Sequence, residues 1–193
     1  MFLSSKPDEA TIREFLSGLA SAPLSYEPVG LCRMNPKGYN VDVHRVRIGT
    51  GESDLETAKQ ALDSFAGVRL GWADVFPEKP TAELGSNVVV IASHMGFWSL
   101  NGCRIVSRLP SDEDPRYGFC YGTLREHAEI GEELFSLELD PDDDGVWYEI
   151  RAVSRPGALI AKAGRSIARG LQKKFREDSA RAMAAAVATA TAG

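Results

Sequence analysis

The chain has 193 residues, of which 44% are hydrophobic and 25% are charged, and its formal net charge is -5. This composition is that of a soluble globular protein, and the length suits one domain with a substantial core. A negative net charge argues against a protein that binds nucleic acid over its whole surface. We therefore expect residues 1–193 to form a single domain, with residues 1–22 as an N-terminal helical extension.

The cysteines and the apolar runs indicate the cellular compartment of the protein and whether it crosses a membrane. Cys32, Cys103 and Cys120 are far apart and lack CxxC or CxxH spacing, which argues against a disulfide framework or a zinc site. The N-terminus has no apolar stretch of the kind found in secretory signals. The longest apolar run, residues 88–92, is much shorter than the about eighteen residues that span a bilayer. We expect a cytoplasmic protein with no transmembrane segment, no metal and no cofactor.

The N-terminal half predicts two helices and two strands. Apolar residues at helical spacing indicate a helix over residues 8–20, followed by an extended, proline-containing segment over 24–38. Residues 41–48 alternate between apolar and polar side chains, which predicts a strand. A capping box opens a second amphipathic helix over residues 53–67. Residues 68–76 can form another strand.

The middle of the chain is rich in β-branched residues. Residues 87–94 form a predicted strand. Residues 95–102 are aromatic with two glycines, so a bulged bend or a tight turn fits them equally well. Residues 103–109 predict a further strand, which ends at the acidic loop 110–115.

The C-terminal third predicts a three-stranded antiparallel meander over residues 117–153, with an acidic turn at 140–145. A long amphipathic helix is predicted to start within residues 154–157, because proline is tolerated in a first helical turn. The alanine-rich tail, residues 184–193, is expected to fray.

These elements predict an α+β fold. No strand–helix–strand alternation occurs, so the sheet should be antiparallel. A curved antiparallel sheet wrapped around a long C-terminal helix is the helix-grip, START-like architecture, here with an extra N-terminal helix. Such folds usually leave a cavity between helix and sheet, although the fold alone does not establish a ligand.

Six stretches of the chain carry a resemblance to a known family: Ser25–Gly30, Gly96–Val106, Gly118–Leu124, His127–Glu133, Val146–Ile150 and Ser154–Pro156. They resemble a bacterial and plant family that is defined only as a domain of unknown function, DUF1990. The family is similar to START-like, or polyketide-cyclase-like, helix-grip proteins, and the resemblance therefore implies the same fold. It carries over no catalytic residues.

Four polar residues lie around the start of the second meander strand: His127, Glu129, Glu132 and Glu133. A histidine beside carboxylates can form an acid/base pair or part of a metal site. The alternative is a solvated hairpin with acidic decoration. Since neighbouring strand residues face opposite sides, only Glu132 or Glu133 can point inward, and Glu133 shares its face with Phe135 and other apolar residues. A buried carboxylate needs a partner or a raised pKa.

The other candidates are aromatic residues and histidines near strand ends. His94 closes an apolar strand face beside Trp98 and can line the mouth of a pocket, or it can be a satisfied core histidine. His44 has the same two interpretations. Glu149 either faces a pocket or, as we favour, forms an outward ladder with Arg151 and neighbouring strands.

The final helix is basic, although the protein is acidic. It can bind an anionic surface or partner, or it can be a solvated face whose apolar stripe covers the sheet, which we favour. The basic residues between Arg151 and Arg181, in the helix and just before it, are Arg151, Arg155, Lys162, Arg165, Arg169, Lys173, Lys174, Arg176 and Arg181.

Three hypotheses follow for function. The first is a cavity that binds a small hydrophobic or amphipathic ligand. The second is an enzyme that uses Glu133 and a histidine for acid/base chemistry in the same cavity. The third is an interaction module that acts through the basic helix. No sequence pattern defines an oligomeric state. The expected ligand-binding residues are His94, Trp98, Tyr121, Glu133, Trp147 and Tyr148.

Overall fold

The computed structural model describes residues 1–94, 96–125, 127–157 and 165–191. One antiparallel sheet carries the fold, and its strands follow the order β2-β8-β7-β6-β5-β4-β3, with β1 paired to β5. The strands are β1 (Phe2–Leu3), β2 (Asn40–Thr50), β3 (Ala73–Phe76), β4 (Asn87–His94), β5 (Phe97–Ser111), β6 (Asp114–Thr123), β7 (Glu129–Leu139) and β8 (Gly145–Pro156). The helices are α1 (Glu9–Gly18), α2 (Gly51–Asp63) and α4 (Arg165–Thr191), with short 3-10 turns at Leu31–Arg33 and Ala66–Val68.

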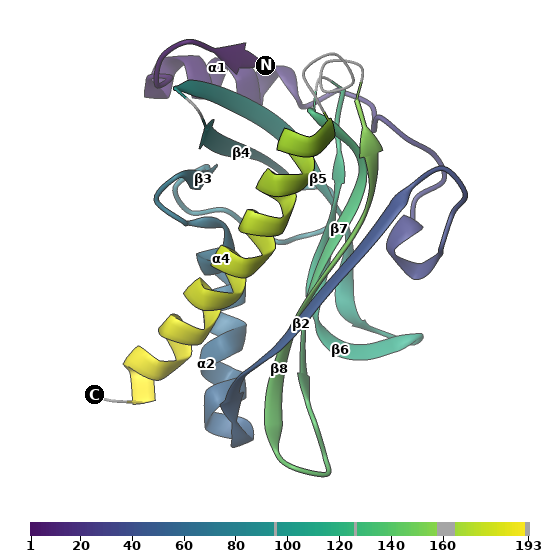
Figure 1. Cartoon of the computed structure of the whole chain (residues 1–193), viewed down its shortest axis with the longest axis vertical. Helices are drawn as coiled ribbons and strands as arrows, with labels where there is room; N and C mark the ends of the chain where they lie inside the picture. Colours follow the sequence, from purple (N-terminus) through teal and green to yellow (C-terminus); the bar gives the residue numbers. More distant parts are fainter. Residues whose placement is uncertain (95, 126, 158–164, 192–193) are drawn as a thin grey trace.

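The sheet curves around α4, as the predicted helix-grip fold requires. Figure 1 shows α4 running across the inner side of the sheet, with α2 beside its C-terminal half. We call the sheet face toward these helices the inner face and the opposite one the outer face. The predicted α+β class and antiparallel sheet are confirmed.

The meander of β6, β7 and β8 forms the centre of this sheet, as predicted. Its register places Phe119 opposite Phe135, and Phe135 opposite Ile150. All three side chains are buried on the inner face, in the main core. Because side chains alternate along a strand, Glu133 also faces inward, as the apolar pattern of β7 predicted.

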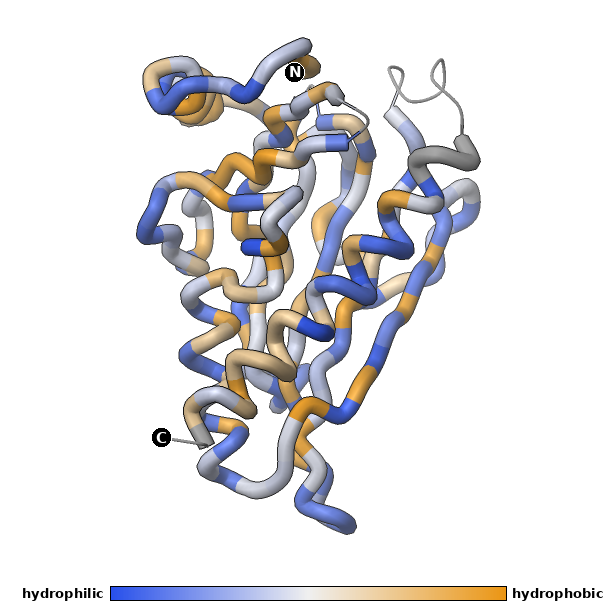
Figure 2. Tube along the Cα trace, turned by 60° about the vertical axis from the view of Figure 1, so that its left-hand side comes forward, coloured by the Kyte–Doolittle hydropathy of each residue, from blue (hydrophilic) through white to orange (hydrophobic). Residues whose placement is uncertain are grey.

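The helix α4 supplies the other side of the core. Figure 2 shows hydrophilic and hydrophobic residues alternating along it, which is the pattern of an amphipathic helix. The helix continues through the tail that was expected to fray, as far as Thr191, because Met183 and Val187 pack into the core. The predicted helix start was wrong: β8 continues to Pro156, paired with Glu129, and part of the expected helix lies outside the described residues.

The bounds of α2, β5 and β3 also differ from the predicted ones, and α2 covers Gly51–Asp63 instead of residues 53–67. The strand β5 begins at Phe97, just after Gly96, and Phe97 already pairs with His94, so residues 97–102 of the predicted bend or turn belong to a strand. Gly96 there has a φ of 81°, a conformation that favours glycine. The strand β3 is shorter than predicted and covers only Ala73–Phe76.

The outer face is covered near β6–β8 by residues from the segment before β2. Tyr26, Leu31 and Cys32 are buried there, and they pack against Cys120, Leu134 and Val153 of the sheet. The described structure therefore has apolar packing on both faces of these strands. This explains why Glu132, which faces outward, is buried as well.

Candidate functional site

A cavity of about 470 Å³ lies between the sheet and α4. Most of its exposed wall is apolar, and the polar groups come from β4 to β8 and from α4. Apolar lining residues include Trp72, Val90, Ala92, Phe97, Leu171 and Phe175. Polar lining residues include His94, Asn101, Glu129, Glu133, Gln172 and Arg176. An apolar pocket with a few convergent polar groups has the composition of a small-molecule site.

Glu133 and Tyr121 form the central polar pair of the cavity. They are cross-strand partners on β7 and β6, so both side chains project from the inner face. The Tyr121 hydroxyl donates to Glu133 Oε2 over 2.5 Å. In the described part of the chain this is the only hydrogen bond assigned to the Glu133 carboxyl, whereas a carboxylate can accept about four.

Burial raises the pKa of Glu133 to about 7, although the Tyr121 hydrogen bond and nearby Arg176 act in the opposite direction. The carboxyl is therefore close to half protonated at neutral pH. In the protonated state it can donate a hydrogen bond as well as accept one. Burial also raises the pKa of Tyr121, which keeps that phenol neutral and able to donate.

The two cavity histidines are neutral near pH 7. Burial lowers the pKa of His127 to about 4, and its Nδ1 accepts a hydrogen bond from the Glu129 backbone N–H at 2.9 Å. The ring proton therefore lies on Nε2. Burial also lowers the pKa of His94, whose Nδ1 is buried with no hydrogen-bond partner among the described residues.

The α4 side of the cavity carries a charged cluster. Arg169 donates to both oxygens of Asp42 on β2, with Nη2 at 2.8 Å from Oδ1. Arg176 lies farther from the same carboxylate, with its Nη2 3.5 Å from Oδ1. Hydrogen bonding to Arg169 lowers the pKa of Asp42, so this carboxylate remains ionised.

Glu132, the neighbour of Glu133, lies in a different environment on the outer face. Its Oε1 accepts hydrogen bonds from the Tyr26 hydroxyl at 2.8 Å and the Gly30 N–H at 2.7 Å. Its Oε2 accepts from the Cys32 N–H at 3.0 Å. The carboxylate thus ties the segment before β2 to the sheet. The sequence did not predict this role, because the donors lie about a hundred residues away.

Cys32, Cys120 and Glu132 are the described residues that come closest to a metal-ligand set, with their ligand atoms within 4.8 Å of one another. Both Glu132 oxygens, however, already accept protein hydrogen bonds. Burial raises the pKa of the Cys120 thiol, which disfavours the thiolate that a metal needs. The cluster therefore fits a hydrogen-bonded packing role better than metal binding.

Of the six residues expected to bind a ligand, the cavity brings together His94, Tyr121 and Glu133. The other three do not belong to the described lining. Trp98 packs near α1, with Lys6 Nζ 5.7 Å from its ring. Trp147 stacks under Arg45, 5.0 Å from the guanidinium carbon. Tyr148 is fully buried in the core, where its hydroxyl lies 2.9 Å from the Ser179 hydroxyl.

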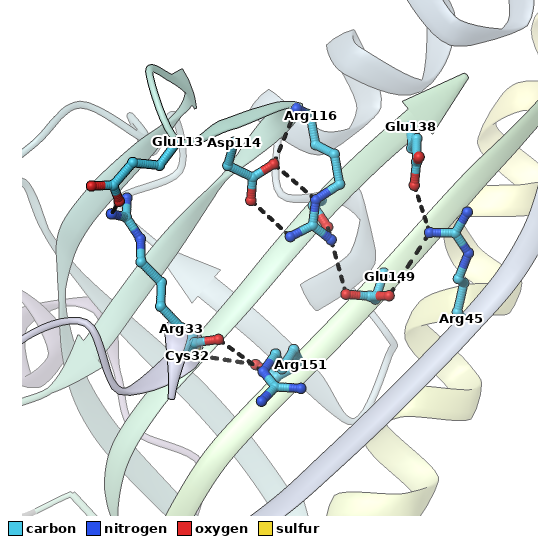
Figure 3. A network of polar contacts seen from close by, with 10 residues as sticks. Cys32, Arg33, Arg45, Glu113, Asp114, Arg116, Glu138, Glu149 and Arg151 are labelled. Atoms are coloured by element: carbon cyan, nitrogen blue, oxygen red, sulfur yellow. Dashed lines mark hydrogen bonds and ion pairs between the residues drawn. The ribbon is translucent and has the colours of Figure 1, made fainter. Parts of the chain in front are cut away.

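Glu149 faces outward in a ladder with neighbouring strands, as we favoured, but Arg151 is not part of that ladder. Arg151 instead donates to the Cys32 and Met34 carbonyls and to the Asn35 side chain. Figure 3 shows the Glu149 carboxylate between Arg116 and Arg45, and Arg116 Nη1 donates to it at 2.9 Å. Arg45 Nη1 lies 3.9 Å from the same group and donates to Glu138 at 2.6 Å. Cross-strand ion pairs of this kind satisfy a solvent-facing sheet surface.

The basic residues of α4 are largely paired with acidic neighbours. Lys174 and Arg181 both contact Asp178, and Lys173 lies 3.7 Å from Glu177. Together with the contact of Arg169 to Asp42, these pairs neutralise much of the charge on the described helix. The arrangement fits the solvated-face interpretation.

The curved sheet, the long C-terminal helix and the intervening cavity define a helix-grip protein. The structure aligns with the crystal structure of Ara h 8.0201 at a TM-score of 0.52 and 13% identity, over 79% of this chain and 99% of that one. It aligns with the hypothetical protein jhp0584 from Helicobacter pylori at a TM-score of 0.54 and 10% identity, over 76% and 86% of the two chains. At these identities the likeness establishes the fold alone. None of the described helices is long and apolar enough to cross a membrane.

Sequence comparison establishes the family. Residues 25–182 match the model described as Domain of unknown function (DUF1990), and the chain belongs to this family. A UPF0548 protein of Dictyostelium discoideum is 30% identical over 97% of this chain and 96% of its own length. A UPF0548 protein of Deinococcus radiodurans is also 30% identical, over 94% and 96%. The resemblance seen in the sequence motifs is thereby confirmed.

Proposed function

We propose that the protein binds a small apolar or amphipathic molecule in the cavity between α4 and the sheet. The observation that carries this proposal is a largely apolar wall that contains the half-buried carboxyl of Glu133, which has one hydrogen bond among the described residues. A cavity of about 470 Å³ falls within the size range of small-ligand pockets. A protein interior without such a role is normally packed with side chains.

Binding is better supported than acid/base catalysis. The catalytic hypothesis needs a histidine hydrogen-bonded to Glu133, so that a proton can pass between them. Among the described residues the Glu133 partner is Tyr121, and the buried phenol is a weak acid with a raised pKa. A neutral tyrosine and a partly protonated carboxyl are well suited to orient a ligand by hydrogen bonds.

We further propose that the protein works in a reducing compartment such as the cytoplasm. Cys32, Cys103 and Cys120 are all free and all buried. Free buried thiols are typical of proteins from reducing environments.

The test is to fill the cavity and measure binding of N-phenylnaphthylamine, a neutral dye that fluoresces in apolar surroundings. Ala92 lines the cavity from β4, so Ala92→Trp should occupy it. Ala10 is an exposed residue of α1, so Ala10→Trp is the matched control. We expect saturable binding to the wild type and to Ala10→Trp, and binding to Ala92→Trp weakened about tenfold or more. Equal affinity in all three proteins would contradict the proposal.

A further inference from the structure

Arg176 is the cationic group among the described residues of the cavity wall. It lies on α4, one residue after Phe175, and both line the cavity. The Arg176 side chain is only 12% exposed, so its guanidinium is largely removed from bulk water. A buried guanidinium needs an anion or several hydrogen-bond acceptors, because it remains charged in proteins.

The acidic partner of Arg176 is already committed to another arginine. Asp42 receives hydrogen bonds at both oxygens from Arg169, which holds it in a bidentate pair. The contact of Arg176 to Asp42 is a single approach at 3.5 Å, longer than a normal hydrogen bond. One carboxylate thus faces two guanidinium groups, and the described residues leave the positive charge of Arg176 largely uncompensated.

The two cavity carboxyls do not supply the missing charge. Glu133 makes its hydrogen bond with Tyr121, and no ion pair between Glu133 and Arg176 occurs in the described structure. Glu129 is turned to Ser154, whose hydroxyl donates to it at 3.1 Å. Burial raises the pKa of both carboxyls, which weakens them as counter-ions near neutral pH. The wall therefore offers an anchored cation beside a protonatable carboxyl.

The surroundings of this cation are apolar. Leu171 and Phe175 flank Arg176 on α4, and Trp72 and Val90 line the same cavity from the sheet side. At the rim, Phe2 and Phe97 are 45% and 56% exposed although they also line the cavity. A matching ligand has one anionic head group and a long apolar body.

We propose that Arg176 anchors the head group of an amphipathic carboxylate, so that the cavity takes molecules of the fatty-acid class. This inference rests on the proposed ligand-binding function and specifies its ligand. The carboxylate of the ligand accepts hydrogen bonds from the Arg176 guanidinium, and Glu133, when protonated, donates a further one. A carboxylate suits this anchor because its two oxygens match the fork of a guanidinium.

The test compares three molecules with the same apolar chain and different head groups. Dodecanoate, dodecanol and dodecylamine are titrated separately by calorimetry, below their micelle concentrations. We expect dodecanoate to bind wild-type protein about tenfold or more tightly than dodecanol, as one charge-assisted hydrogen bond implies. Dodecylamine should bind more weakly than either. Equal affinities for dodecanoate and dodecanol would overturn the inference.

Substitutions on α4 then show whether Arg176 causes the preference for dodecanoate over dodecanol. In Arg176→Gln the ratio of the two affinities should fall to about one, since the charge is lost. Arg176→Lys keeps the charge and should retain part of the preference. Arg181→Gln is the control, because Arg181 is 71% exposed and pairs with Asp178 away from the described lining. An unchanged ratio in Arg176→Gln would contradict the role of Arg176.

The failure of this inference is distinguishable from failure of the proposed function. If dodecanol and dodecanoate bind equally, the cavity is a ligand site without a carboxylate anchor. If none of the three molecules binds, and the neutral dye does not bind either, both proposals are wrong. Should Arg176→Gln not fold, as judged by its thermal transition, the wild-type comparison and Arg176→Lys still decide the question.

Discussion

Glu132 and Glu133 are adjacent in sequence, but Glu132 is buried and Glu133 is half-buried, and their surroundings differ. Glu132 is 3% exposed on the outer face and accepts hydrogen bonds from Tyr26, Gly30 and Cys32. Glu133 faces the cavity and accepts one from Tyr121. The same side chain is thus saturated with donors on one face of β7 and nearly unpaired on the other.

The difference separates a structural carboxylate from a functional one. A buried charge that accepts several hydrogen bonds stabilises the fold and has little capacity left for a ligand. A half-buried carboxyl beside empty space has a raised pKa, as Glu133 does, and its remaining hydrogen-bonding capacity is available. Substitutions at Glu132 and Glu133 should therefore have different effects on the stability of the fold.

The largest effect is expected from removing the outer carboxylate. Glu132→Ala leaves the buried N–H groups of Gly30 and Cys32 without their acceptor and should lower the free energy of unfolding by about 3–5 kcal/mol. Glu133→Ala is the matched variant, and its loss should be clearly smaller, because one hydrogen bond to Tyr121 is removed. Urea unfolding measures both. Equal losses would show that the two faces do not differ as described.

The next largest effect is a pH dependence of the stability of the fold, which comes from the ionisation of Glu133. Its pKa is about 7 in the folded chain, above the ordinary value of 4.5, so folding favours the protonated form. Its contribution to stability is therefore complete below pH 4.5 and is lost as the pH rises through 7. The rise of the pKa from 4.5 to about 7 corresponds to about 3 kcal/mol in the free energy of unfolding.

Glu133→Gln tests this directly, since the amide cannot ionise. Relative to wild type, the variant should gain stability between pH 5 and pH 8, by up to about 3 kcal/mol. His127 acts in the opposite direction, because its pKa is lowered to about 4, so its contribution is lost as the pH falls from 6.5 toward 4. Subtracting the two unfolding curves cancels the His127 contribution. A flat difference across this range would refute the raised pKa of Glu133.

The smallest losses of unfolding free energy are expected when either tyrosine that donates to these carboxyls is replaced by phenylalanine. Tyr26→Phe removes a donor to Glu132 and should cost about 1.5–3 kcal/mol, the usual range for a hydrogen bond to a charged group. Tyr121→Phe should cost about 0.5–1.5 kcal/mol near pH 5, where Glu133 is largely neutral. It should also raise the pKa of Glu133 further, because the Tyr121 hydrogen bond lowers it. A larger loss of stability in Tyr121→Phe than in Tyr26→Phe near pH 5 would contradict the difference between the surroundings of Glu133 and Glu132.

Glu133 also illustrates what could be predicted from sequence. Alternation along β7 places Glu133 with Phe135 on one face, and this local pattern was sufficient to predict an inward carboxyl. The antiparallel sheet and the meander followed from the same kind of periodicity. The start of the last helix could not be predicted, because Ser154-Arg-Pro is compatible with both a strand end and a helix start.

The remaining site residues depend on contacts between distant segments. The burial of Glu132 requires the segment with Tyr26 and Gly30 to fold over the outer face. The aromatic residues Trp98 and Tyr148 were expected in the cavity wall, but aromatic character does not distinguish a lining side chain from a packed one. Arg176 was identified only as part of a basic helix, since its shared contact with Asp42 comes from the docking of α4 against β2.

The three tryptophans allow the most direct test of the central claim, that the cavity is the ligand site. Trp72 lines the cavity, whereas Trp98 packs near α1 and Trp147 stacks under Arg45 on the outer face. An ω-bromododecanoate ligand quenches indole fluorescence on contact. The measurement is its titration into Trp98→Phe/Trp147→Phe, which retains Trp72, and into Trp72→Phe. We predict saturable quenching in the first protein and little in the second. Quenching confined to the Trp72→Phe protein, or absent from both, would contradict the account.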